Sequence, residues 1–321
     1  MDNKSGQRMK ELLTAYRMPL FSVAMIWIYF RHNFFYNDFS FGILDPITHI
    51  GDIGVDIFLF LSGYGLTFSI KKYPDSISFY KRRLIRILPS VIILLGIFAV
   101  VDPMIGLSKW YEIVKPQYWF FSIYSIYWYV GAILLFYMLF PFIINKVEQC
   151  GSAKTIIATY VIAIAGVLLI KFSHIGIFQQ LVLYFARVPI FVMGVCMAYY
   201  GFWRREMFLA CFIVSIPLVY LLPKDLQRIS YSLMAVAIVC YLPYILDKLP
   251  SIIKKALKVS GLWSLEFYLI HIYLLKNNTL GIINERICSQ STTSLIVLTF
   301  VLLLSWIANN AIVKFIKTVG L

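Results

Sequence analysis

Charged residues are scarce in this chain, and acidic residues are the scarcest. Of its 321 residues, 14% are charged and 61% are hydrophobic, with 15 Asp and Glu against 29 Lys and Arg. About a quarter of the residues in a soluble domain are charged, so this composition excludes an ordinary soluble fold. The mean hydropathy of +0.81 indicates instead a chain whose main solvent is lipid.

Cysteine and histidine are also few. The five cysteines show no C-x-x-C or other paired spacing, so the sequence predicts neither a disulfide framework nor a metal site. There are only four histidines. Two of them, His49 and His174, fall in predicted loops, and we do not expect them to take part in chemistry.

The chain lacks internal repeats, low-complexity stretches and long linkers. We therefore expect a single membrane domain over residues 1–321, with no appended soluble domain. The first seventeen residues are polar and basic, and the apolar run after them has no small-residue cleavage site. This pattern favours a retained first helix over a cleaved signal peptide.

Long apolar runs, by contrast, fill most of the sequence. A helix crosses a bilayer with about 20 mainly apolar residues. By this criterion the predicted fold is all-α, a polytopic integral membrane protein with about ten transmembrane helices. The predicted spans lie near residues 18–36, 53–70, 87–101, 119–144, 155–171, 178–200, 207–222, 229–246, 261–276 and 294–313.

The basic residues are distributed unevenly between the connecting segments. Ten spans put both termini on one side, and 20 of the 29 Lys and Arg fall on that side against seven on the other. The positive-inside rule then predicts that both termini are cytoplasmic, in a plasma (inner) membrane. Because the basic residues gather in short loops, the formal charge of +14 does not indicate nucleic-acid binding.

Ionisable residues inside the predicted spans are the best candidates for function, since each costs at least about 2.5 kcal/mol at the bilayer centre. His32 falls near the outer end of the first span. Asp52 and Asp56 fall near the outer end of the second span, and their i, i+4 spacing puts them on one helical face. Glu266 and His271 fall in the ninth span, with His271 nearer the outside.

Two of these candidates leave alternatives open. Arg187, just before Pro189 in the sixth span, either pairs with a carboxylate such as Glu266 or lines a cavity. His32 is either a packed interfacial histidine or a catalytic one. A neutral imidazole can accept a proton from a hydroxyl near neutral pH, and Asp56 is then the preferred carboxylate to orient it.

A basic cluster lies on the predicted inner side. Arg82, Arg83 and Arg86 come just before Pro89. On a helix, Arg83 and Arg86 can face one anion together, and guanidinium groups suit phosphate. The alternative is that the cluster is only a positive-inside anchor.

Taken in order, these features resemble the acyltransferase family 3 membrane proteins, which O-acylate sugars of cell-surface polysaccharides. The matching order and spacing extend from about residue 15 to the end of the chain. The resemblance rests on Arg17 and His32 around the first span, GVDIFLFLSGY at 54–64, the RxxR of Arg83 and Arg86 followed by Pro89, WYVGAILLFYMLFP at 128–141, and SLEFYLIH at 264–271.

The resemblance implies an enzyme that moves an acyl group, preferably acetyl, from cytoplasmic acyl-CoA to a hydroxyl of a cell-surface or exported saccharide. It implies that Arg83 and Arg86, with Arg82 and Arg17, bind the CoA phosphates. It also implies that His32 is the acyl-transfer residue, as a base or as a transient acyl carrier. Acetyl-CoA is then a donor substrate, and no permanently bound cofactor is implied. The alternative is a secondary transporter or flippase, which the lack of an inverted repeat disfavours.

Overall fold

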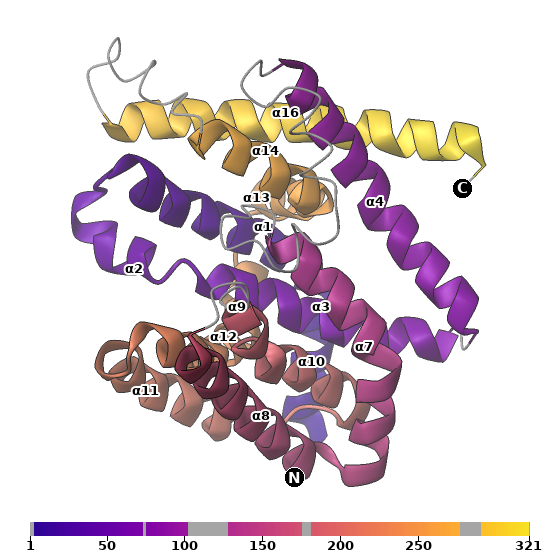
Figure 1. Cartoon of the computed structure of the whole chain (residues 1–321), viewed down its shortest axis with the longest axis vertical. Helices are drawn as coiled ribbons and strands as arrows, with labels where there is room; N and C mark the ends of the chain where they lie inside the picture. The colour runs from indigo at the N-terminus through magenta and orange to yellow at the C-terminus, as the bar shows by residue number, and fades with distance from the viewer. Residues whose placement is uncertain (1–2, 73–74, 102–127, 175–180, 277–289, 321) are drawn as a thin grey trace.

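A computed structural model describes residues 3–72, 75–101, 128–174, 181–276 and 290–320 (Figure 1). Most residues in these ranges are helical, and none of the described residues forms a strand. The prediction of an all-α fold is therefore confirmed. A helix suits a chain rich in apolar runs because it satisfies all of its backbone hydrogen bonds within one segment, which lipid requires.

The helices follow the chain in two halves. The first half contains α1 (Asn3–Asn37), the 3-10 turn η1 (Gly42–Leu44), α2 (Asp45–His49), α3 (Ile53–Lys72), α4 (Ser76–Val101), α7 (Trp128–Cys150) and α8 (Ser152–Ser173). The second half contains α9 (Leu181–Phe185), α10 (Val188–Tyr200), α11 (Arg205–Leu221), α12 (Lys224–Asp247), α13 (Ser251–Ser260), the 3-10 turn η3 (Gly261–Trp263), α14 (Ser264–Lys276) and α16 (Gln290–Val319).

Eight stretches of helix in the described part of the chain are long and apolar enough to cross a membrane. They correspond to eight of the ten predicted spans. The other two predictions fall on α11, which has 17 residues, and on η3 with α14, which has 13. The protein is thus a polytopic helical membrane protein, and the count of ten spans stays a prediction. The predicted segment 119–127 lies outside the described residues.

The predicted sixth span is interrupted. Helix α9 ends at Phe185, and α10 begins at Val188 with Arg187 as its N-cap. Pro189 explains the break, because proline has no N–H to donate and its ring clashes with the preceding turn. The interruption places the Arg187 side chain inside the bundle, where it is only 2% exposed.

The centre of the bundle is the contact between α3 and α10. Both helices are buried over most of their length, whereas α16 is mostly exposed. Gly63 of α3 faces the backbone of Phe191, and Gly194 of α10 faces the backbone of Phe60. Small residues at such a crossing let two helix backbones approach closely, so a side chain at either glycine would push the central helices apart.

Helix α1 connects this centre to the C-terminal part of the chain. It packs against α3 and α12 and also against α13 and α14. Helix α14 in turn packs against α4 and α16 (Figure 1). As a result α1, α3, α4 and α7 from the first half of the chain and α14 and α16 from the second half surround one internal space.

Candidate active site

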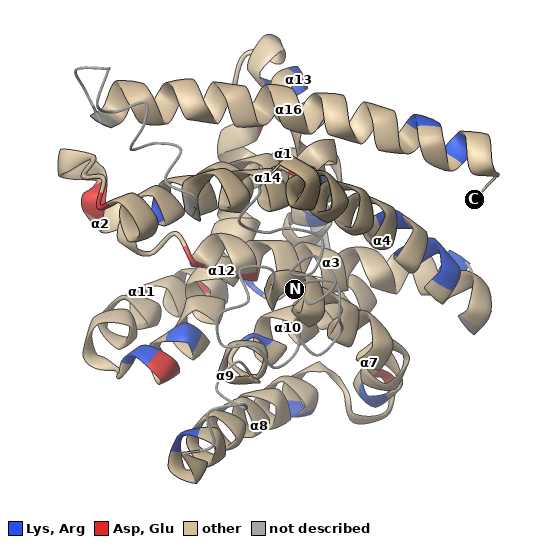
Figure 2. Cartoon of the chain, turned by 45° about the horizontal axis from the view of Figure 1, so that its top comes forward, with Lys and Arg blue, Asp and Glu red and all other residues tan. Residues whose placement is uncertain are grey.

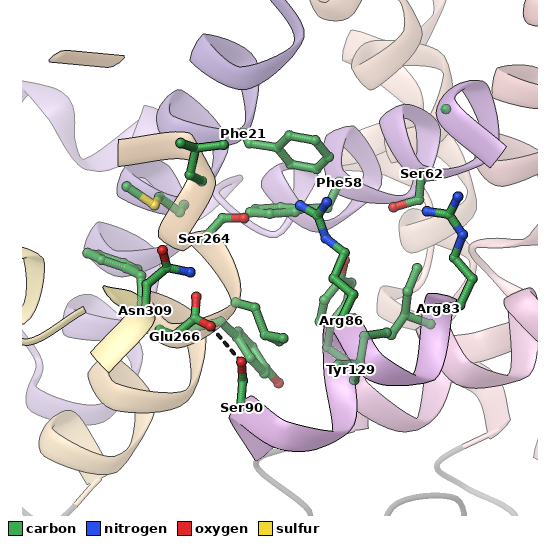
Figure 3. A pocket seen from close by; sticks show the side chains of 18 of the residues that line it. Phe21, Phe58, Ser62, Arg83, Arg86, Ser90, Tyr129, Ser264, Glu266 and Asn309 are labelled. Atoms are coloured by element: carbon green, nitrogen blue, oxygen red, sulfur yellow. Dashed lines mark hydrogen bonds between the residues drawn. The ribbon is translucent and has the colours of Figure 1, made fainter. Parts of the chain in front are cut away.

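That space is a cavity of about 680 Å³. Its apolar walls come from α1, α3 and α7, with Phe21, Met25, Phe58 and Ile133 among the lining side chains. Polar side chains gather at separate places along it, as Figure 3 shows for Arg83, Arg86, Ser90 and Glu266. The cavity is therefore an apolar passage with a few localised polar groups, which is the usual composition of a small-molecule site.

Four arginines line the basic part of the cavity: Arg17 of α1 and Arg82, Arg83 and Arg86 of α4. Arg82 and Arg86 are exposed, so the cavity opens to the surface here. Arg83 is half-buried and donates a hydrogen bond to the Ser69 hydroxyl, while its Nε has no hydrogen-bond partner among the described residues. Several guanidinium groups at an open mouth favour a polyanionic ligand.

Arg17 is held in place by helix α3. Its Nε and Nη2 donate to the carbonyl oxygen of Leu61, at 3.3 and 3.1 Å. The guanidinium also packs directly over Gly65, where any side chain would collide with it. The sequence -LSGYG- at 61–65 thus provides both an acceptor and a gap for a cation, and this positions Arg17 at the cavity wall.

Helix α4, which carries three of these arginines, is capped by an acidic residue. The Asp75 carboxylate accepts a hydrogen bond from the Ser78 N–H at 2.7 Å. Hydrogen bonds from Ser78 also keep the pKa of Asp75 below its usual value.

The basic residues of α4 share a face with a serine deeper in the cavity. Arg83, Arg86 and Ser90 are spaced i, i+3, i+7, so they line up along one side of the helix.

A polar cluster follows the arginines. The Ser90 hydroxyl donates to a carboxylate oxygen of Glu266 at 2.6 Å, and both residues are buried (Figure 3). Ser264 and Asn309 line the same region from α14 and α16. Such a cluster offers both donors and acceptors to a bound ligand inside an otherwise apolar passage.

Two histidines meet beyond this cluster. His271 lines the cavity, and its Nε2 lies 2.9 Å from Nδ1 of His32. His271 is only 1% exposed, whereas His32 is half-buried. His32 and Arg17 both belong to α1 and are 15 residues apart, which corresponds to about 22 Å along the helix axis. The histidines and the arginines are therefore separated by much of the thickness of a bilayer core.

The hydrogen bonds of the histidine pair define its tautomers when both rings are neutral. Nδ1 of His271 lies 2.8 Å from the carbonyl oxygen of Phe267, which can only accept, so this nitrogen carries the proton. Nε2 of His271 is then an acceptor, and Nδ1–H of His32 donates to it. This order leaves the lone pair of His32 on Nε2, which makes that atom available as a base or nucleophile.

The geometry gives Asp56 a partner other than His32. Asp56 is fully buried, and its Oδ2 lies 4.0 Å from Nε of Arg187. The Arg187 guanidinium also lies 4.8 Å from the centre of the Trp128 ring and donates to the Leu183 carbonyl. Of the two alternatives for Arg187, pairing with a carboxylate is the one realised, but the carboxylate is Asp56 and not Glu266.

Asp52 has a different partner from Asp56. It comes just before α3, and its Oδ1 lies 3.7 Å from Nε of Arg31. Asp56, four residues further on, is inside the bundle. The two carboxylates therefore form separate ion pairs, Asp52 with Arg31 and Asp56 with Arg187.

The structure thus collects the predicted residues into two groups. Arg17, Arg82, Arg83, Arg86, Glu266 and His271 line the cavity, and His32 joins it through His271. Asp56 and Arg187 form a separate pair. Sequence reasoning missed Ser90 and Asn309, although the i+7 spacing from Arg83 and a polar residue within the last span were available signals. Among the described residues, no group of three or more His, Cys, Asp or Glu is placed to hold a metal ion.

The described part of the chain is thus a polytopic helical bundle that encloses a cavity, with arginines at its mouth and His271 at the opposite part of its lining. Comparison with protein families identifies the kind of enzyme. The model of the acyltransferase family 3 domain matches residues 22–309, so the chain belongs to that family and is a membrane acyltransferase. Comparisons with curated proteins and with solved structures found no match.

Proposed function

We propose that this acyltransferase moves an acetyl group from acyl-CoA, bound in the cavity, to a hydroxyl of a cell-surface or exported saccharide. The observation that carries the proposal is the continuity of one cavity from four arginines to His271, which is hydrogen-bonded to His32. A donor with phosphates at one end and a thioester at the other matches this distribution of groups.

The arginine end suits the CoA phosphates. Guanidinium groups form charge-assisted, often bidentate hydrogen bonds with phosphate oxygens. The pantetheine arm then extends along the apolar walls past Ser90 and Glu266. Its amide N–H groups need acceptors in this passage, and the Glu266 carboxylate is one.

The histidine end suits the transfer step. Nε2 of His32 takes the proton of the acceptor hydroxyl, and the hydroxyl oxygen attacks the thioester carbonyl carbon. The C–S bond breaks, an ester forms, and CoA leaves with the proton as the free thiol. His271 keeps Nδ1 of His32 protonated throughout, so the lone pair of His32 stays on Nε2.

Purified protein in nanodiscs tests the proposal. With acetyl-CoA and a saccharide extract we expect release of CoA thiol together with acetylated saccharide, detected by mass spectrometry. If thiol is released without saccharide and an acetyl group is trapped on His32, then His32 acts as a transient acyl carrier and not as a base. Absence of both products with acetyl-CoA bound would refute acetyl transfer.

The orientation is part of the same proposal: the termini and the arginine end face the cytoplasm of a plasma-membrane protein, where acyl-CoA is available. The uneven distribution of Lys and Arg supports this orientation. Labelling with an impermeant thiol reagent in intact cells tests it. We expect Cys288, which lies outside the described residues, to react, and the exposed Cys150 to remain unlabelled. The reverse pattern would overturn the orientation and the proposed source of the donor.

A further inference from the structure

Helix α13 differs from the other helices in its distribution of side chains. It has ten residues and follows α12 after a short connection at Lys248–Pro250. None of its residues is buried. Three residues on one face, Lys254, Leu257 and Ser260, are partly covered, and their i, i+3, i+6 spacing marks the side that rests on the bundle.

The outward side of α13 carries two different stripes. Ile252, Ala256 and Val259 form an apolar stripe, in which Ile252 is 76% exposed. Lys255 and Lys258 form a basic stripe beside it, and both lysines are exposed. Figure 2 shows the basic residues of α13 at the outer edge of the molecule, beyond α16.

Hydrogen bonds to α1 and α12 fix this orientation. The Ser22 hydroxyl of α1 bonds with the Leu257 carbonyl and lies 2.9 Å from the Ser260 hydroxyl. Lys254 Nζ donates to the Asp247 carbonyl at 3.2 Å. With its inner face held at both of these places, α13 cannot rotate its apolar stripe into the bundle.

Two adjacent stripes of this kind match the membrane–water interface. An apolar stripe left exposed to water would be unfavourable, and two lysines in the acyl-chain region would be costly. A helix lying in the interface avoids both costs, because its apolar side lies against the acyl chains and its lysines lie at the headgroups. We propose that α13 is an interfacial helix and that Lys255 and Lys258 bind the phosphate of an anionic phospholipid.

The site lies beside the cavity but is distinct from it. Helix α13 continues into η3, where Leu262 both lines the cavity and is 52% exposed. A lipid bound along α13 therefore lies next to the cavity rim. The proposal rests on the two stripes and their anchoring and does not depend on the identity of the acyl donor.

Native mass spectrometry of the whole protein, titrated with phosphatidylglycerol or phosphatidylcholine, tests the site. We expect wild type to prefer phosphatidylglycerol, and Lys255→Gln with Lys258→Gln to reduce that preference by about fivefold per lysine, from about 1 kcal/mol for each basic residue near an anionic surface. The matched control is Lys314→Gln with Lys317→Gln, two exposed lysines of the same spacing on α16. If both double variants lose the preference for phosphatidylglycerol equally, the effect depends on net charge alone, and the proposed site on α13 is wrong.

Two further measurements separate a lipid from a soluble anion. Ile252→Ser with Val259→Ser should weaken lipid binding although both lysines remain, because the acyl chains lose their contact with α13. Excess inorganic phosphate should leave phosphatidylglycerol bound to wild type. If phosphate displaces phosphatidylglycerol and the apolar substitutions have no effect, the lysines bind a free anion, and the proposed lipid site is refuted. Thermal unfolding in detergent checks that all variants remain folded.

Discussion

The His32–His271 pair and the Asp56–Arg187 pair are both polar contacts inside the bundle, yet they differ in charge and access. The histidines form a directional hydrogen-bond chain that ends at the cavity, and His32 is half-buried. The side chains of Asp56 and Arg187 are 0% and 2% exposed, and neither is among the described residues that line the cavity. A buried polar pair can act in catalysis only where substrate can reach it, and elsewhere each group keeps the other from being buried without a partner.

The largest effect should come from His32→Ala. General base assistance contributes about 10²- to 10⁴-fold, so acyl transfer should fall by that factor while acyl-CoA binding stays unchanged. Transfer to saccharide by purified protein is the measurement. His49→Ala and His174→Ala are the matched controls and should stay active. If folded His32→Ala keeps the wild-type rate, His32 is a structural residue, and the contrast between the histidine pair and the Asp56–Arg187 pair disappears.

Asp56→Ala should act mainly on stability. Removing one partner of a buried ion pair leaves an uncompensated charge and costs about 3–5 kcal/mol, to be measured by thermal and denaturant unfolding in detergent. Adding Arg187→Met should restore part of the loss. If Asp56→Ala instead abolishes transfer while unfolding is unchanged, Asp56 acts in catalysis, as the sequence predicted, and the contrast between the two pairs disappears.

Arg83→Ala and Arg86→Ala should each weaken acyl-CoA binding by about 1.5–3 kcal/mol, since each removes a charge-assisted phosphate contact. Lysine should rescue only in part because it lacks the planar guanidinium fork. Calorimetric titration with CoA measures the effect. Arg205→Ala, which removes a cation stacked on Tyr241 of another region, is the control. Unchanged affinity in a folded double variant would assign the cluster to membrane anchoring.

His271→Leu should have a smaller effect than His32→Ala, since it removes only the group that orients His32. We expect the transfer rate to fall about 10- to 100-fold, with the pH dependence of kcat displaced because His32 loses its tautomer preference. His271→Gln retains a side-chain carbonyl that can accept from Nδ1–H of His32 and should recover much of the rate. If His271→Gln and His271→Leu are equally impaired in rate and share the wild-type pH profile, the orienting role is refuted.

The sequence predicted individual elements well where a short segment contains all the necessary information. Apolar runs of about 20 residues define helices because lipid leaves the backbone no other partner, and the i, i+3 spacing of Arg83 and Arg86 determines their common face. The sequence did not predict the break at Arg187, although Pro189 was its signal. Helix α14 was expected to form a full span, but its described length is 13 residues.

What the sequence could not decide is which polar groups meet across the bundle. Asp56 and His32 were predicted to interact because both lie near the outer ends of their helices, but depth in the membrane does not define the direction of a side chain. That direction depends on how each helix is rotated about its axis, and the close packing of α3 on α10 at Gly63 and Gly194 sets the rotation of α3. The sequence alone therefore determined a helical membrane protein with basic and histidine clusters at different depths. Only the tertiary structure joined His32 to His271, 239 residues away, because that contact depends on the packing of α1 against α14.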